Sequence, residues 1–326
     1  MHPGLHAFLH ELIDYAGLFP PARLDLNPAI NNFARYCSEA DAWMLGRFII
    51  PVGRLVELEA HASLFEEQEP MRFSVLGHQV EGQDVSEALS RTIRDAKAFE
   101  EQYDGNVIAD RFEFKLEPPL PDRAEIADLF HEAGEHLQSS LSRPSKAFYE
   151  VPLMGERWEH NLEMVAELIT DHNSSAGNDV IGLKMRCGGV TKDAFPSVDA
   201  VARTIHTCIQ AEIPMKGTAG LHHPVRHFAD SVDTMMHGFL NVFGGAVLAY
   251  THSFDRATLE RVVSDEVSDH FEFGEGGFRW MDHVASVEEI QTARRELATS
   301  YGSCSFDEPR EDLQSLGMLE TVSPNT

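Results

Sequence analysis

One stretch of the sequence, residues 179–224, restricts the possible folds more than any other. It holds two apolar runs, Val180–Leu183 and Ile213–Met215, and each run is followed at once by a lysine, Lys184 or Lys216. Between the runs, apolar side chains recur at helical spacing: Val198, Val201, Ile205, Cys208 and Ile209. A strand–helix–strand unit of this length joins parallel neighbouring strands. We therefore expect both lysines at the C-terminal ends of adjacent strands.

The alternation of strand-like and helix-like segments continues along most of the chain. Strands are predicted at 12–16, 42–51, 72–76, 107–117, 147–153, 180–184, 213–216 and 239–243, with helices between them that include 54–68 and 228–237. A further helix is predicted at 287–299, in the tail that follows the last strand. No G-x-G-x-x-G follows the first strand, which disfavours a dinucleotide-binding fold. The pattern predicts a single (β/α)8 barrel over residues 1–270, a C-terminal cap over 271–320 and a disordered tail over 321–326.

Charge and composition exclude several kinds of partner. The 326 residues include 53 acidic and 26 basic side chains, so the formal net charge is −27. Such a charge repels nucleic acids and anionic membrane surfaces. The N-terminus has no basic region before an apolar core, and no apolar run reaches the length of a membrane span. We expect a cytoplasmic protein whose four cysteines are reduced.

Polar residues at the ends of the predicted strands are the candidates for chemistry. Residues two apart on a strand share a face, so Lys184 lies with Arg186, and Lys216 with Thr218. Further candidates on the strands are Asp14, Arg47, Glu113 or Glu117, Lys115, Glu150 and Asn241. Cations of this kind bind a small anionic metabolite, and carboxylates transfer protons. A buried layer of ion pairs without catalytic function is the alternative.

Two neighbouring lysines have a specific use in catalysis. Each positive charge lowers the pKa of the other. A lysine that is neutral near pH 7 attacks carbonyl carbons and forms a Schiff base, while its neighbour helps proton transfer. The lysine pair therefore suggests chemistry on a carbonyl compound.

The segments K-M-R-C-G-G, from Lys184, and K-G-T-A-G, from Lys216, resemble class I aldolases of the deoxyribose-phosphate type. The resemblance implies that Lys184 is the Schiff-base residue and that Lys216 adjusts its pKa. Met185, Arg186 and Cys187 replace the small hydroxyl residues of that family. Over its whole length, from AGLFPPA to YGSCSFDEP, the chain also resembles a family of bacterial proteins that implies no activity.

Glycines and histidines near the predicted strand ends suggest two further features. Gly220 and the pair Gly244-Gly245 lie where barrels commonly bind phosphate. His222 is a candidate for substrate binding or catalysis. Alternatively, His222 and His223 could hold a divalent metal such as zinc together with Glu150.

These observations favour a cofactor-free lyase of aldolase type. Lys184 forms the imine with a small anionic carbonyl compound, with or without a phosphate group. Glu150 or Asp14 transfers protons, and Arg186 and the glycine loops hold the anion. A metal-dependent hydrolase or isomerase and a non-catalytic binding or scaffold barrel are the alternatives. The apolar segment 235–250 is either core or an interface in a homo-oligomer.

Overall fold

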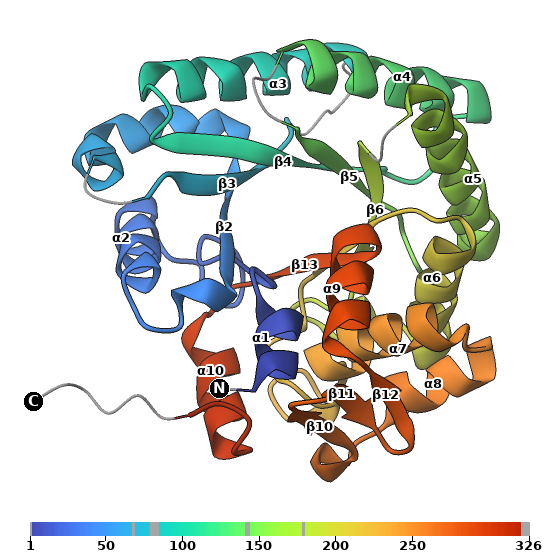
Figure 1. Cartoon of the computed structure of the whole chain (residues 1–326). Helices are drawn as coiled ribbons and strands as arrows, with labels where there is room; N and C mark the ends of the chain where they lie inside the picture. Colours follow the sequence, from blue (N-terminus) through green and yellow to red (C-terminus); the bar gives the residue numbers. More distant parts are fainter. Residues whose placement is uncertain (1, 67–68, 79–84, 141–143, 178–179, 321–326) are drawn as a thin grey trace, which may run out of the picture.

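The computed structural model describes residues 2–66, 69–78, 85–140, 144–177 and 180–320. Eight parallel strands close into a barrel with the order β1-β13-β7-β6-β5-β4-β3-β2 (Figure 1). They are β1 (Ile13–Tyr15), β2 (Leu45–Pro51), β3 (Met71–Leu76), β4 (Val107–Lys115), β5 (Lys146–Glu150), β6 (Ile181–Arg186), β7 (Met215–Thr218) and β13 (Ala298–Ser303). The predicted (β/α)8 barrel is confirmed.

Helices surround the barrel and pack their apolar faces against its strands (Figure 1). They are α2 (Leu26–Cys37), the 3-10 helix η2 (Val52–Phe65), α3 (Val85–Gln102), α4 (Arg123–Ser140), α5 (Trp158–Ala176), α6 (Val198–Gln210), α8 (Arg256–Ser264) and α9 (Val287–Glu296). Helix α6 shows how the sequence specifies them. Its side chains Val201, Ile205 and Cys208 are fully buried, and the Ser197 side chain caps its first turn by accepting from the Ala200 amide.

The eighth strand lies elsewhere than the sequence predicts. Residues 239–243 belong to a helix, the π-helical segment η4 (Leu240–Gly244), which continues into α7 (Gly245–His252). Every residue from 239 to 249 is buried, so this helix has no polar face, and its apolar run looks like a strand. The segment is core of this chain. The strand that closes the barrel is β13, which pairs with both β1 and β7.

The position of β13 also moves the boundary of the barrel. Residues 298–303 fall inside the segment 271–320 that the sequence assigned to a cap, so the barrel extends past residue 270. What remains after β13 is the short helix α10 (Asp307–Ser315), which packs beside α2 through a hydrogen bond from Tyr36 to Asp307. The predicted tail, 321–326, lies outside the described residues.

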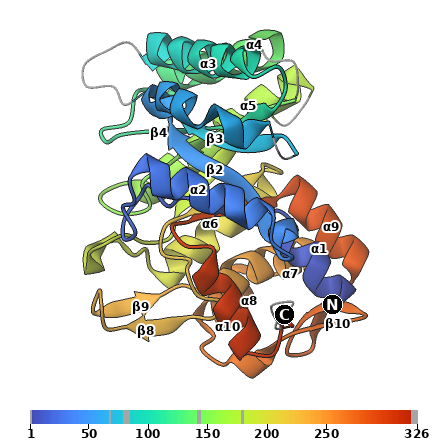
Figure 2. The ribbon, with the colours of Figure 1, turned by 90° about the vertical axis from the view of Figure 1, so that its left-hand side faces the viewer.

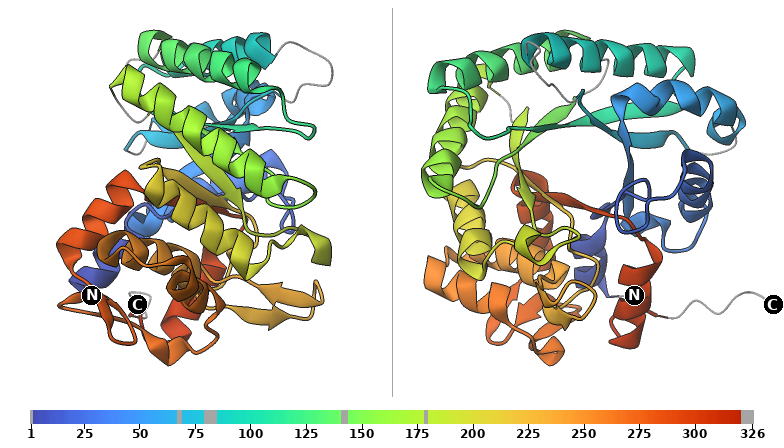
Figure 3. Two further views of the ribbon diagram at one scale, coloured as in Figure 1. Left: turned by 90° about the vertical axis from the view of Figure 1, so that its right-hand side faces the viewer. Right: turned by 180° about the vertical axis from the view of Figure 1, so that it is seen from behind.

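Two small sheets lie at opposite ends of the barrel (Figures 2 and 3). The hairpin of β8 (His227–Ala229) and β9 (Thr234–Met236) follows β7, where a helix was predicted over 228–237. Asp233 there takes a left-handed φ of 50°, which ends a helical pattern and forms the turn. The other sheet, β10 (Phe271–Gly274), β11 (Gly277–Trp280) and β12 (His283–Ala285), packs against α1 (Pro3–Leu9).

Three single-turn 3-10 helices complete the described elements: η1 (Ala42–Met44), η3 (Lys192–Ala194) and η5 (Ser268–His270). The predicted helix at 54–68 is the 3-10 helix η2, and its last two predicted residues lie outside the described part. Among the described residues, no helix has both the length and the apolar character needed to cross a membrane.

Asn241 joins three parts of the fold and is buried there. Its Oδ1 accepts from the Arg226 amide at 2.8 Å, and its Nδ2 donates to the carbonyls of Val262 and Asp265 at 2.8 Å each. Its amide is therefore fully used within the protein. These bonds give Asn241 a structural role, and its predicted contact with substrate stays a prediction.

We predict that Asn241→Ala lowers the free energy of unfolding by about 3 kcal/mol, because three main-chain groups lose their buried partner. Urea unfolding followed by circular dichroism measures the change. The matched control is Asn31→Ala on the exposed face of α2, where a change within about 0.5 kcal/mol is expected. Equal effects of the two substitutions would contradict the structural role of Asn241.

Candidate functional site

Strand register brings the two lysines together at the C-terminal ends of the strands. Lys184 on β6 is the direct neighbour of Lys216 on β7 and of Glu150 on β5. Neighbours in register point to the same side of a sheet, and in this barrel that side is the interior. Lys184, Lys216 and Glu150 are all buried. The sequence prediction for these three residues is confirmed in its geometry.

Glu113 on β4 lies between the two lysines. Its Oε2 is 2.9 Å from the Lys184 Nζ, and its Oε1 is 3.4 Å from the Lys216 Nζ. The Ser74 hydroxyl on β3 donates to Oε1 at 2.5 Å. The sequence left open whether Glu113 or Glu117 faces inward. Glu113 does, because it is only 2% exposed.

Lys216 is the more enclosed of the two lysines, with no exposed surface. Its Nζ donates to Asp14 Oδ2 on β1 and, at 3.2 Å, to the Ser300 hydroxyl on β13. Ser300 in turn donates to Asp14 Oδ2 at 2.8 Å. The closing strand therefore completes the environment of Lys216.

Lys184 lies nearer to solvent than Lys216. It is 6% exposed and pairs with Glu150 Oε2 at 3.0 Å. Glu150 also accepts from Arg186 Nε at 2.6 Å. The Arg186 side chain is 43% exposed, so it marks the point where this cluster meets solvent.

The carboxylates hold the cluster in its ionised form. Burial alone would raise the pKa of Glu113, but Lys184 and Lys216 outweigh it and lower that pKa to about 2. Burial would lower the pKa of Lys184, yet Glu113 and Glu150 outweigh it and raise that pKa. The prediction that the lysine pair lowers the pKa of Lys184 is wrong, because a carboxylate separates the two ammonium groups.

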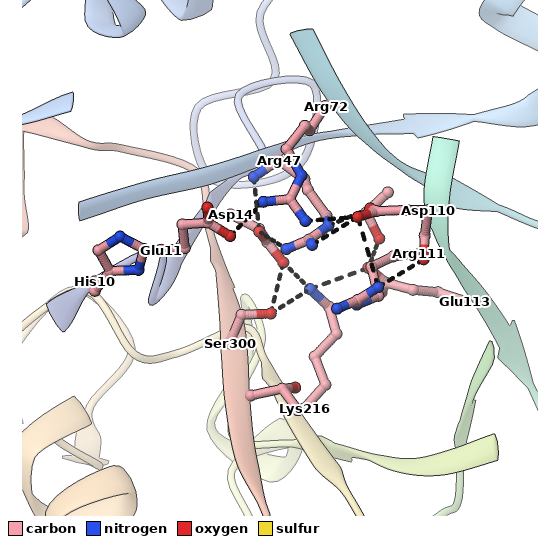
Figure 4. Close-up of polar contacts among 12 residues, drawn as sticks. His10, Glu11, Asp14, Arg47, Arg72, Asp110, Arg111, Glu113, Lys216 and Ser300 are labelled. Carbon is pink, nitrogen blue, oxygen red and sulfur yellow. Dashed lines mark hydrogen bonds and ion pairs between the residues drawn. The ribbon is translucent and has the colours of Figure 1, made fainter. Parts of the chain in front are cut away.

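The charged contacts continue toward the N-terminal ends of the strands (Figure 4). Asp14 Oδ1 accepts from the main-chain amide of Arg47 on β2 at 2.8 Å. The Arg47 side chain pairs with Asp110 at 2.5 Å, and Arg72 pairs with Asp110 at 2.6 Å. Asp110 is the extra residue of a β-bulge, since Phe73 pairs with Ala109 and Ser74 with Arg111. The bulge explains how Asp110 contacts the interior beside Arg111.

Several residues predicted to bind substrate have other roles or places. Gly244 and Gly245 lie within the buried helix η4–α7, where their missing side chains make room for Phe278 and Leu259. The prediction placed them in a loop after a strand, and the structure places them inside a helix instead. Gly220 has a left-handed φ of 68° and packs against Gly188 in the neighbouring loop. These small residues let two loops approach closely.

Lys115 and Thr218 lie at the rim of the C-terminal mouth. Lys115 is half-exposed and pairs with Glu117 at 2.8 Å, away from the lysine pair. Thr218 is the Cα partner of Arg186 across β6 and β7, and it is partly buried. Both positions remain predictions for substrate contacts.

The predicted metal ligands are not brought together. Glu150 pairs with Lys184 and Arg186, and His223 Nδ1 lies 2.5 Å from Asp312. His222 Nδ1 lies 3.8 Å from the Cys304 thiol and 3.4 Å from Glu308. In the described part of the chain, no three His, Cys, Asp or Glu side chains are grouped to hold a metal ion.

His222 carries a positive charge at neutral pH. Burial would lower its pKa, but its contacts with Cys304 and Glu308 outweigh burial and raise the pKa to about 9. This charge makes His222 a poor metal ligand, because an imidazole must be neutral to coordinate.

A surface hollow of about 480 Å³ lies apart from the charged cluster. It is lined by residues of η5, β10 and the end of α10, with His2 beside them. None of the lining residues belongs to the cluster. We assign the candidate site to the cluster, because it contains the reactive groups.

Comparisons with other proteins do not show the function of this chain. No protein-family profile matches the sequence, and no curated protein is similar to it. One similar solved structure is an aldolase with 13% identity and a TM-score of 0.40, matched over 64% of this chain and 80% of the aldolase. Another is active domain 2 of a thermostable chitinase from Pyrococcus furiosus, with 13% identity and a TM-score of 0.41 over 75% and 97%. Likenesses this weak support neither enzyme class.

We predict that Glu113→Gln destabilises the protein by about 3–5 kcal/mol at pH 7, because it removes one partner from a buried ion-pair cluster. The folded pKa of Glu113, about 2, lies below its reference value of 4.5. Its ionisation therefore contributes stability above pH 4.5 that is lost as the pH falls toward 2. Urea unfolding at a series of pH values measures both effects.

The variant should lack this part of the acid dependence. Glu272→Gln is the matched control, since Glu272 pairs with Arg279 on the exposed sheet and should change stability by less than about 1 kcal/mol. Unchanged stability of Glu113→Gln at pH 7 would show that the cluster is not ionised as described.

Proposed function

We propose that this chain is an enzyme that forms an imine between Lys184 and a small anionic carbonyl compound. The observation that carries the proposal is the position of Lys184. Its amine lies between two carboxylates, Glu113 and Glu150, directly below a solvent-exposed arginine, Arg186. Active sites of (β/α)8 barrels lie at this end of the strands.

The cost of burying the cluster supports a function for it. The interior of such barrels is usually filled with layers of apolar side chains. Here the C-terminal half of the interior holds Asp14, Glu113, Glu150, Lys184 and Lys216 instead. Removing charges from water costs more than a buried ion pair commonly returns. A barrel that needed only stability would be better filled by apolar residues.

Substrate binding itself can start the reaction. At rest Lys184 is an ammonium ion, because its pKa is raised. An anionic group that binds Arg186 competes with Glu150 for the guanidinium, and Glu150 then loses part of the positive charge that keeps it ionised. Glu150 becomes a stronger base at 3.0 Å from the Lys184 Nζ. The anion therefore promotes transfer of a proton from Lys184 to Glu150.

The chemical step then follows from the free amine. The Lys184 nitrogen adds to the carbonyl carbon, and a proton passes from that nitrogen to the carbonyl oxygen to give a neutral carbinolamine. Glu150 returns the proton it took from Lys184 to the hydroxyl group, which leaves as water, and the iminium ion that remains has its positive charge beside Glu113. Lys216, Ser300 and Asp14 form a second proton-carrying group next to it. That group could protonate or deprotonate the carbon adjacent to the imine.

One observation favours the non-catalytic alternative. Each of Lys184, Lys216 and Arg186 already has a carboxylate partner within the protein. A purely structural ion-pair layer would have the same resting geometry. The two proposals differ in what a carbonyl compound does to Lys184, and trapping experiments measure this directly.

We predict that borohydride traps a covalent adduct on Lys184 when the protein is incubated with a panel of small aldehydes, ketones and keto acids, each with and without a phosphate group. Peptide mass mapping locates the adduct. Lys184→Ala should abolish trapping, and Arg186→Gln should reduce it for anionic compounds only. Lys192→Ala, at an exposed lysine paired with Asp233, is the matched control and should trap normally.

Two other outcomes have definite meanings. An adduct on Lys216 would keep the reaction class and exchange the roles of the lysines. Absence of an adduct with every compound, together with Lys184 inert toward amine reagents, would overturn the proposal in favour of the non-catalytic barrel.

A further inference from the structure

The two ends of the charged interior differ in their charge balance. At the C-terminal end, Lys184, Lys216 and Arg186 face Asp14, Glu113 and Glu150, so three positive charges meet three negative ones. At the N-terminal end, the ion pairs with Asp110 and Glu11 join three arginines to these two carboxylates, which leaves 3 − 2 = 1 positive charge in excess within this group. Those five residues are Arg47, Arg72, Arg111, Glu11 and Asp110.

Asp110 forms its close hydrogen bonds with two arginines, and the third arginine stands further away. Its Oδ1 accepts from Arg47 Nε at 2.5 Å, and its Oδ2 accepts from Arg47 at 2.9 Å and from Arg72 at 2.6 Å. Arg111 reaches Oδ2 only at 3.6 Å, beyond hydrogen-bonding distance. Within the described part of the chain, its side chain donates one hydrogen bond, to the main-chain carbonyl of Asp110 at 2.7 Å.

Arg111 is thus a mostly buried cation, and the described residues leave most of its N–H groups without a hydrogen bond. A guanidinium has five N–H donors, and Arg111 uses one of them in a hydrogen bond with the residues that the structure describes. Burial, and then the nearby charge of Arg47, lower the pKa of Arg111 to about 10. Arg111 shares the Asp110 carboxylate with Arg47 and Arg72, so its positive charge is only partly balanced.

The arginines are reachable from outside. Side-chain exposure falls from 39% at Glu11 through 28% at Arg72 and 18% at Arg111 to 4% at Arg47. Figure 4 shows these side chains converging on Asp110 from β2, β3 and β4. The group therefore opens to solvent on its Glu11 side and ends at the buried Arg47.

We propose that the N-terminal mouth of the barrel binds a small oxyanion, such as a phosphate group, through Arg111 and Arg72. The fork of a guanidinium matches the oxygen spacing of phosphate and carboxylate groups. One bound anion supplies the missing counter-charge. In a protein with a net charge of −27, a cluster with excess positive charge is a selective place for such a ligand. This site is independent of the chemistry proposed for Lys184.

Titration calorimetry with inorganic phosphate tests the proposal, with chloride at equal ionic strength as the reference. We expect wild-type protein to bind phosphate. Arg111→Gln should weaken binding about tenfold or more, since a hydrogen bond to a charged group contributes about 1.5–3 kcal/mol. Glu11→Gln should strengthen binding several-fold, because it raises the excess from one positive charge to two.

Arg123→Gln, at an exposed arginine paired with Glu167, is the matched control and should keep the wild-type affinity. Arg186→Gln tests the opposite mouth, and phosphate binding through Arg111 and Arg72 should survive it. Arg111→Lys retains the charge without the fork, and it should bind with intermediate affinity if Arg111→Gln does not fold. Acetate distinguishes the ligand types: equal affinity for acetate supports an oxyanion site that takes carboxylates, and weaker affinity supports a phosphate site.

Three results would overturn the inference. The first is the absence of phosphate binding above the chloride reference. The second is unchanged affinity in both Arg111→Gln and Arg111→Lys. The third is loss of binding in Arg186→Gln alone, which would place the anion at the C-terminal mouth. None of these results bears on whether Lys184 forms an imine.

Discussion

The attraction of one carboxylate for two ammonium groups determines the arrangement of the barrel interior. Glu113 lies between Lys184 and Lys216, so the two lysines can occupy adjacent strands without strong repulsion. Without it, two buried positive charges would stand side by side in a medium of low polarity, and one would lose its proton. Two further carboxylates balance the lysine charges: Asp14 pairs with Lys216, and Glu150 pairs with Lys184. The cluster is therefore stable while all of its members are present, and removal of any one of them leaves a buried charge without its partner.

This balance changes how lysine chemistry would work here. A lysine pair without a carboxylate between its members would be reactive at rest. In this barrel the reactive form must be produced, and Arg186 offers a way for an anionic ligand to produce it by drawing charge from Glu150. Reactivity would then depend on the ligand, and the empty site would be protected from adventitious aldehydes. The same electrostatics that suppress reactivity could thus supply selectivity.

Much of this architecture follows from sequence patterns, and the failures have physical causes. The β6–α6–β7 unit has distinct apolar periods, so its strands and both lysines are predicted correctly. The sequence predicts a strand at 239–243, because a helix that is buried on all sides has no polar face and its apolar run looks like that of a buried strand. The true closing strand, ATSYGS, is small and polar, since its inward side chain Ser300 serves Lys216 and Asp14. Strand propensity alone does not reveal such a segment.

The remaining omissions come from contacts that no local pattern encodes. Ser74 is not predicted as a residue of the site, because a single serine within an apolar strand does not by itself indicate a function. Asp110 and Arg111 face the interior through a β-bulge, and a bulge shifts the two-residue period that sequence reasoning depends on. The sequence does not decide between Glu113 and Glu117, because an uncertain strand boundary changes which face each residue occupies. The contacts of Glu113 with Lys184 and Lys216 fix its inward position.

The late position of β13 has a consequence for how the protein is made. During synthesis, β1 to β7 leave the ribosome well before residues 298–303, and until then β1 and β7 have open edges. Unpaired edges and unfinished interiors recruit other chains or chaperones. Asp14 and Lys216 can meet during this interval, but Ser300 cannot yet join them. A nascent chain would therefore carry its lysines before it has the surroundings that restrain them.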